Sequence, residues 1–351
     1  MNTLVYSALA LTLVSAPGFA SENEWSSLDQ EIESLSSSLS AQDATGPKIN
    51  GWVISSFRHS SDIDVDPDPA NEEDQSGFFL ESVRVEISGD AGSDYSYKVS
   101  FELSGGTAAL RDAYATFKIG DSVNGRMGNF KQPFLRSALI SDNRLLFLDR
   151  TFLGGLFAGR DLGLMFFGSF DTLDWYIAAQ NGQDGVADEF LFTGRIAANL
   201  MGSGTGKVEG AYGAGDESNL SVGAAVADDG AIEDGLHWAL EAAFAQGPFS
   251  VAGEIVSFDD GIDGTNFFGP GDLLADTTPW DITASYMFTD MYEVAVRYQD
   301  LDNDDDGRIL GAVVNRYVQG HDIKWLLQYQ KLESDTVDDI DEIGLGLAVS
   351  F

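Results

Sequence analysis

The sequence predicts an all-β protein, a sixteen-stranded antiparallel barrel that crosses a membrane. The first observation is the C-terminal segment, in which Ile343, Leu345, Leu347, Val349 and Phe351 share one face and Gly344, Gly346, Ala348 and Ser350 share the other. A period of two is typical of a strand. An apolar face opposite a small-residue face suits a strand between lipid and a lumen. An inner strand of a soluble β-sandwich alternates in the same way, so this segment alone leaves both folds open.

The second observation is the number of such segments. Strands are predicted at 49–58, 78–88, 95–103, 110–119, 126–131, 162–170, 173–180, 190–200, 220–227, 236–246, 249–258, 280–288, 292–300, 309–317, 322–332 and 342–351, with Gly, Asp, Asn and Ser clusters between them. A further candidate, 207–214, would leave the chain ends on opposite sides of the membrane. Single-chain bacterial barrels have an even strand number, so we expect 201–219 to be a long periplasmic turn.

The third observation is that short and long connections alternate along the chain. Short ones include 89–94, 171–172 and 247–248, and long ones include 59–77, 259–279 and 301–308. Acidic residues gather in the long connections: residues 59–77 contain Asp62, Asp64, Asp66, Asp68, Glu72, Glu73 and Asp74. Short periplasmic turns and long outer loops are typical of outer-membrane barrels. A soluble sandwich gives no reason for length and charge to vary together.

Two segments precede the barrel domain, 46–351. Residues 1–20 have the apolar core and small residues of a secretory signal peptide, although no Lys or Arg precedes that core. In residues 21–45, Trp25, Leu28, Ile32, Leu35 and Leu39 have heptad spacing. We therefore predict a short periplasmic helix that assists trimer formation. The alternative is an amphipathic or disordered segment at the barrel rim.

Composition excludes several classes of function. The chain has 57 acidic and 19 basic residues, a net charge of -38 and no cysteine. A nucleic-acid partner is not expected, because binding phosphate backbones needs a basic face. The three histidines form no zinc motif, and no catalytic motif or cofactor is predicted. Asp302, Asp304 and Asp306 begin like a calcium loop, but Val313 stands where the loop needs a glutamate. Plain solvated carboxylates are the alternative.

One internal motif resembles a known family. Gly128-Asn129-Phe130-Lys131-Gln132-Pro133-Phe134 is similar to the Gly-x-Phe-Lys-x-Pro-Phe signature of the phosphate-selective porin O and porin P family. The segments 147–150 and 159–163 resemble the family's return into the next strand. This resemblance implies a trimeric outer-membrane porin that passes anions through a pore narrowed by a long loop, here 131–160. The net charge of -38 departs from that pattern.

The predicted loop is positively charged, although the chain as a whole is strongly negative. Residues 126–160 hold six basic residues and two acidic ones, whereas 208–296 hold no Lys or Arg. The predicted constriction residues are Lys131, Arg136, Arg144, Arg150 and Arg160. Strand alternation and the same local charge place further cations on the pore wall: Arg84, Lys98, Lys118, Arg126, Arg195, Arg297 and Lys324. Glu86, Glu102 and Asp112 also face inward. The alternative reading is that these cations pair with carboxylates and hold the loop in place.

The sequence therefore predicts a porin in the outer membrane of a Gram-negative bacterium, in contact with lipid and lipopolysaccharide. Small ions and hydrophilic solutes, with phosphate among them, are expected to diffuse through it. Fixed cations at a constriction favour anions, because low-dielectric walls focus their field. Two alternatives stay open: a general or cation-preferring porin dominated by its acidic mouths, and a structural or adhesive barrel with a plugged lumen.

Overall fold

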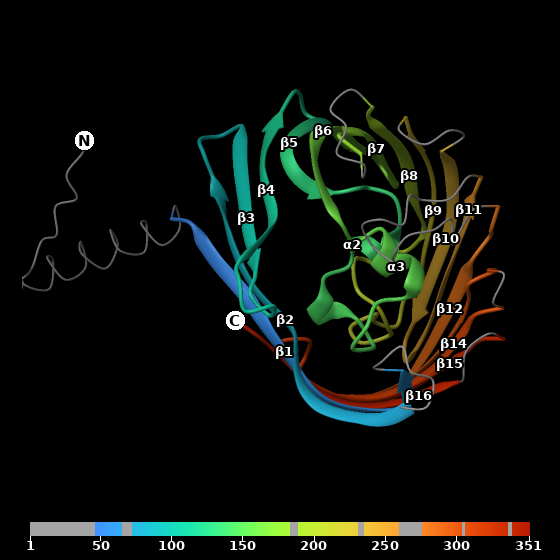
Figure 1. Cartoon of the computed structure of the whole chain (residues 1–351). Helices are drawn as coiled ribbons and strands as arrows, with labels where there is room; N and C mark the ends of the chain where they lie inside the picture. Colours follow the sequence, from blue (N-terminus) through green and yellow to red (C-terminus); the bar gives the residue numbers. More distant parts are fainter. Residues whose placement is uncertain are drawn as a thin grey trace, which may run out of the picture. The chain divides into compact units, whose positions relative to one another are not determined.

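A closed antiparallel barrel forms the body of the protein. The computed structural model describes residues 46–64, 72–182, 189–230, 235–259, 276–303, 306–335 and 339–351. In these residues each strand pairs with its sequence neighbours, and β1 pairs with β16 to close the ring (Figure 1). The predicted fold class is confirmed for the barrel. The predicted signal peptide and N-terminal helix lie outside the described residues.

All sixteen predicted strands occur within the described ranges. The first eight are β1 (Lys48–Asp64), β2 (Glu72–Asp90), β3 (Tyr95–Glu102), β4 (Ala109–Lys118), β5 (Val123–Lys131), β6 (Arg160–Phe170), β7 (Leu173–Gln180) and β8 (Leu191–Met201). The second eight are β9 (Asn219–Asp229), β10 (Leu236–Gln246), β11 (Phe249–Phe258), β12 (Trp280–Thr289), β13 (Tyr292–Asp300), β14 (Arg308–Gln319), β15 (Ile323–Glu333) and β16 (Ile340–Ser350). No helix in these ranges is long and apolar enough to span a membrane.

The barrel carries its apolar side chains outward. In β16, Ile343, Leu345 and Val349 are exposed, while Gly344, Gly346 and Ala348 are buried on the lumen side. Large apolar side chains are exposed in the same way on strands around the ring, such as Leu164, Ile177, Leu240 and Val296. An outer apolar band is what a lipid-embedded barrel needs.

The small residues on the lumen face of β16 leave room for side chains that pack against this strand. A Cβ at Gly346 would lie 2.3 Å from Leu326 Cδ1 and 2.5 Å from Leu148 Cδ2. A Cβ at Gly344 would lie 2.9 Å from Leu148 Cδ1. Because Leu148 belongs to the long loop between β5 and β6, the glycines of β16 provide the space in which that loop packs.

Candidate functional site: the pore constriction

The connection between β5 and β6, residues 132–159, folds into the lumen. It contains two short α-helices, α2 (Arg136–Leu139) and α3 (Phe152–Leu156), and the 3-10 helix η1 (Asp142–Arg144). Figure 1 shows α2 and α3 inside the ring of strands. We call this connection the constriction loop, because it lies inside the barrel where the resemblance led us to expect a loop that narrows the pore.

The motif at residues 128–134, which leads from β5 into the loop, can be explained at most of its positions by the contacts that its residues make. Gly128 has φ +130, and a Cβ there would lie 2.2 Å from the Ala113 carbonyl oxygen, so the close approach of β4 requires glycine. The Asn129 side chain donates to the Arg111 carbonyl. Phe130 and Phe134 are buried at 1% and 0% exposure. Gln132 Nε2 donates to Thr193 Oγ1 of β8 at 2.9 Å, and this hydrogen bond joins the beginning of the loop to β8.

Two apolar clusters hold the constriction loop against the wall. In the first, the loop residues Phe134, Leu135, Ala138, Leu153, Leu156 and Phe157 pack on Leu191, Ala225, Ala227, Ala239, Val256 and Phe258 of β8 to β11. In the second, Leu146, Phe147 and Leu148 pack on Trp52, Ile54, Ala295, Val313, Leu326 and Ala348 of β1 and β13 to β16. The loop therefore covers these strands, and open space remains beside β2 to β7.

Several wall cations satisfy backbone carbonyls of the buried loop. Arg195 Nη1 donates to the Phe134 carbonyl at 2.6 Å and also pairs with Glu241. Arg297 Nη1 donates to the Asp149 carbonyl at 2.9 Å, and Lys324 donates to the Leu145 carbonyl. Buried carbonyl groups need such donors. The predicted wall residues Arg195, Arg297 and Lys324 thus all contact the backbone of the loop.

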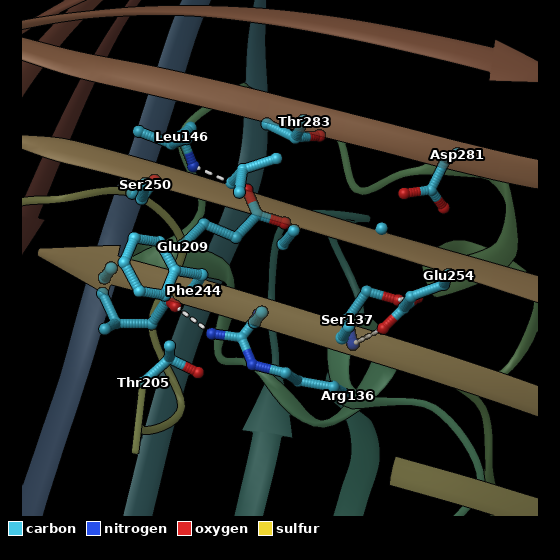
Figure 2. Close-up of a pocket in the computed structure, with 18 of the residues that line it drawn as sticks. Arg136, Ser137, Leu146, Thr205, Glu209, Phe244, Ser250, Glu254, Asp281 and Thr283 are labelled. Carbon is cyan, nitrogen blue, oxygen red and sulfur yellow. Dashed lines mark hydrogen bonds between the residues drawn. The ribbon is translucent and has the colours of Figure 1, made fainter. Parts of the chain in front are cut away.

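Wall carboxylates accept hydrogen bonds from the loop's backbone. Glu241 Oε2 accepts from Arg136 N at 2.7 Å, and Glu254 Oε1 accepts from Ser137 N at 2.8 Å. Both bonds lie at the start of α2. Figure 2 shows Ser137 beside Glu254, with Asp281 on the next strand.

The turn between β8 and β9, residues 202–218, also reaches the lumen. It contains no strand, which confirms the expectation of a long turn at 201–219. Glu209 Oε2 accepts from Leu146 N at 2.9 Å, and Arg136 Nη2 donates to the Val208 carbonyl at 2.5 Å (Figure 2). Arg136 was predicted at the constriction, and in the structure it joins the constriction loop to this turn.

Two cavities remain beside β2 to β7. The cavity nearer the short strand connections has a volume of about 320 Å³, and the cavity nearer the long connections has a volume of about 510 Å³. We call them the periplasmic and the extracellular cavity, because short connections of outer-membrane barrels face the periplasm. Four residues line both cavities, and we call the place where they meet the narrow passage: Arg84, Asp142, Arg150 and Arg160. Arg84 and Arg160 come from the wall, and the other two come from the constriction loop.

Each cation of the narrow passage has a carboxylate partner. Arg84 Nη2 lies 3.1 Å from Glu102 Oε2 and 3.4 Å from Asp142 Oδ2. Arg150 Nη2 donates to Asp142 Oδ1 at 2.5 Å. Burial opposes the charged form of Asp142, but Arg150, Lys131 and Arg84 lower its pKa below the usual value. Asp142 is therefore the shared counter-ion of two arginines.

The third cation of the passage, Arg160, lies close to two basic residues of the periplasmic cavity, Lys98 and Lys131. Arg160 Nε lies 3.3 Å from Asp112 Oδ1, and Lys98 Nζ lies 2.7 Å from Glu86 Oε1. Lys131 donates to the Ala138 carbonyl and lines the periplasmic cavity.

Charge differs between the two cavities. The periplasmic cavity is lined by seven basic side chains, Arg84, Lys98, Arg126, Lys131, Arg150, Arg160 and Lys207, and by three carboxylates, Glu86, Asp112 and Asp142. The extracellular cavity is lined by four cations, Arg84, Arg111, Arg150 and Arg160, and by four carboxylates, Glu81, Glu102, Asp142 and Asp149. The net positive field therefore lies at the passage and on its periplasmic side.

Of the other predicted residues, Arg126 lines the periplasmic cavity, but Lys118 and Arg144 line neither cavity. Lys118 is exposed at the end of β4, where its Nζ donates to the Ser93 carbonyl at 3.1 Å. The Arg144 carbonyl accepts from Glu209 N at 3.1 Å.

The calcium candidate is described in part. Asp304 lies outside the described residues. Asp302 Oδ2 accepts from Thr278 N at 2.6 Å, and Asp306 pairs with Arg308. The described ranges contain no group of three or more His, Cys, Asp or Glu side chains placed to hold a metal ion.

Two basic residues that line the cavities, Arg111 and Lys207, were not predicted from the sequence. Arg111 lines the extracellular cavity because a register shift between Val99 and Phe101 breaks the simple alternation of β4. Lys207 lines the periplasmic cavity because the turn after β8 folds inward. The register shift and the inward fold follow from tertiary packing and leave no clear sequence signal.

A sixteen-stranded transmembrane barrel with an inward-folded loop and a charged passage is the architecture of an outer-membrane porin. Residues 55–187 match the family model described as phosphate-selective porin O and P. This match confirms the resemblance and, with the fold, places the protein in the outer membrane of a Gram-negative bacterium. A comparison with curated proteins finds no match.

Solved porin structures share the barrel at low sequence identity. The anion-selective porin from Comamonas acidovorans has a TM-score of 0.61 and 13% identity, over 87% of this chain and 99% of that one. A loop L8 deletion mutant of OmpT from Vibrio cholerae has a TM-score of 0.60, 13% identity and the same coverage of both chains. Salmonella typhi OmpF in complex with daunomycin has a TM-score of 0.58 and 14% identity, over 88% and 99%. These likenesses concern the fold.

Proposed function

We propose that this porin prefers small anions, phosphate among them, and that the preference arises at the narrow passage. The observation that carries the proposal is the presence of three guanidinium groups, Arg84, Arg150 and Arg160, among the four residues shared by both cavities. Lys131, opposite Arg160 in the register of β5 and β6, adds a basic side chain at the same level. Fixed charges act most strongly where the pore is narrow, because the low-dielectric walls focus their field.

The net charge of -38 does not decide the selectivity. At physiological salt, exposed charges are screened over about 8 Å. Many of the carboxylates lie in the outer loops, where water and salt screen them. The passage instead meets a periplasmic cavity lined by seven basic side chains and three carboxylates. This local balance supports the anion-preferring reading over the cation-preferring alternative.

Phosphate is a suitable ligand for the chemistry of this passage. The planar fork of arginine can donate two hydrogen bonds to one oxyanion. Here, however, Arg150 already donates to the Ser137 and Ile140 carbonyls and to Asp142. The proposal is therefore a general anion preference to which phosphate binds weakly, in a protein that we expect to be a homotrimer.

A planar-bilayer experiment tests the proposal. The reversal potential is measured with purified protein across a tenfold KCl gradient, with and without phosphate. We expect chloride to be more permeant than potassium and phosphate to reduce the chloride current. A cation-selective channel would contradict the anion preference and favour the acidic mouths. Absence of conductance would favour a structural barrel with a plugged lumen.

A further inference from the structure

An aromatic cluster lines the lumen beside the periplasmic cavity. Tyr114 of β4, Phe167 of β6 and Tyr176 of β7 face inward and are half-buried. Phe167 and Tyr176 are cross-strand neighbours whose rings stack at 6.1 Å between centroids. The lumen of an outer-membrane barrel is ordinarily polar. Three aromatic rings on one patch of this wall therefore offer a flat apolar surface to a permeating solute.

Arg126 lies within this cluster. Its Cζ is 4.1 Å from the centroid of the Tyr114 ring and 5.1 Å from that of Phe167. Its Nε donates to Thr116 Oγ1 at 3.3 Å, and no carboxylate in the described part of the chain pairs with it. The rings hold the guanidinium by cation–π contact, so its free N–H groups are available to a ligand in the lumen.

A second cation lines the same cavity from the turn after β8. Lys207 is exposed to the cavity, and no ion pair or hydrogen bond of its ammonium group occurs within the described ranges. The surrounding protein and the positive charges of Arg126 and Arg195 lower the pKa of Lys207, whereas Asp174 acts in the opposite sense. Arg126 and Lys207 therefore both face the same cavity.

We propose that Arg126, Lys207 and the rings of Tyr114, Phe167 and Tyr176 form a binding subsite for small aromatic carboxylates. Arg126, held by the rings of Tyr114 and Phe167, and Lys207 would bind the carboxylate, while the aromatic body of the solute packs against Tyr176. A cavity of about 320 Å³ is large enough for such a molecule. The inference rests on the proposed anion preference and names a class of solute for it.

The subsite is separate from the narrow passage. Arg126 precedes Lys131 by five residues on β5, which corresponds to about 16 Å along the strand. The four residues shared by the two cavities include none of the five subsite residues. Substitutions in the subsite therefore leave the charges of the passage in place, and the two proposals can be tested independently.

Competition by organic anions tests the subsite. The concentration that halves the single-channel chloride conductance is measured for benzoate, cyclohexanecarboxylate and inorganic phosphate. We expect wild-type protein to bind benzoate about fivefold more tightly than cyclohexanecarboxylate, the effect of one aromatic contact. In Arg126→Gln the half-blocking benzoate concentration rises about tenfold, the effect of one charge-assisted hydrogen bond. In Tyr176→Leu the preference for benzoate over cyclohexanecarboxylate falls, and phosphate block is unchanged.

The matched control is Lys118→Gln, which removes a cation at the rim of β4 and should not change benzoate block. Heat-modifiable migration in gels verifies that each variant barrel is folded. Equal block by benzoate and cyclohexanecarboxylate, or unchanged block in Arg126→Gln, would overturn the subsite. A cation-selective wild-type channel would overturn the anion preference alone, because benzoate block that depends on Arg126 would still support the subsite.

Discussion

Arg58 of β1 and Asp149 of the constriction loop form a bidentate ion pair. Arg58 Nη1 donates to Asp149 Oδ2 at 2.8 Å, and Nη2 donates to Oδ1 at 2.9 Å. Gln330 of β15 also donates to Asp149, at 3.1 Å. The pair therefore ties the second half of the loop to the seam where the barrel closes, and the predicted pore cations did not include it.

Asp149→Asn should loosen this attachment without leaving an unpaired charge. Arg58 retains Glu81 and Glu342 as partners. Because the Asp149 side chain is 43% exposed, water screens the pair and the loss of stability should be about 1 kcal/mol. Urea titration of the refolded barrel measures the change. Asp339→Asn is the control, since Asp339 pairs with Lys331 on the surface. A loss as small as that of the control would contradict an anchoring role for Asp149.

The contribution of Asp149 should depend on pH in acid. Partial burial favours its neutral form, but the hydrogen bonds and charge of Arg58 lower its pKa below the usual value. A depressed folded-state pKa gives stability that is present above the unfolded value of about 3.9 and is lost as pH falls through the folded value. The stability difference between wild type and Asp149→Asn should thus be constant from pH 7 to about pH 5 and decline below about pH 4. A constant difference down to pH 2 would show that Asp149 acts without its charge.

Selectivity should respond in opposite directions to two substitutions at the passage. Arg160→Gln removes a cation, and Asp142→Asn removes a carboxylate. A unit charge at ~5 Å changes the energy of an ion in water by about 0.8 kcal/mol, which is roughly fourfold in occupancy. The chloride-to-potassium permeability ratio, taken from reversal potentials, should fall in Arg160→Gln and rise in Asp142→Asn. Shifts of the same sign would indicate that loop displacement, rather than local charge, sets the ratio.

Alternation in the sequence predicted the strands and the inward direction of most cations, but it did not separate pore residues from anchors. Arg84 of β2 and Arg297 of β13 are both inward and almost fully buried. Arg84 borders the two cavities, whereas Arg297 contacts the Asp149 carbonyl and Glu209. The two arginines differ because the apolar constriction loop packs on the side of the lumen that contains Arg297 and leaves the side of Arg84 open. Small inward residues, such as Gly346 on β16, are the sequence signal of the side on which the loop packs. From the sequence, we interpreted these residues only as facing the lumen.

Arg297→Met should be strongly destabilising and nearly neutral for selectivity. Arg297 is 1% exposed, pairs with Glu209 at 3.2 Å and lies 4.1 Å from the Phe147 ring centroid. Removing one partner of a buried pair costs about 3–5 kcal/mol. We expect a large fall in the urea midpoint and an ion selectivity of unchanged sign in the channels that still form. The double variant Arg297→Met with Glu209→Gln should recover part of the loss. No recovery would mean that the pair itself contributes little.

Cysteine labelling tests whether the turn after β8 enters the pore. The chain has no cysteine, so a single introduced thiol gives a clean signal. Lys207→Cys places the thiol in the periplasmic cavity, and Lys118→Cys places it at the rim. An anionic sulfonate reagent added on the periplasmic side replaces a cation by a negative charge at either position. We expect single-channel chloride conductance to fall markedly for Lys207→Cys, because its charge lies in the conduction path, and to change little for Lys118→Cys. Equal responses would show that residues 202–218 stand outside the pore.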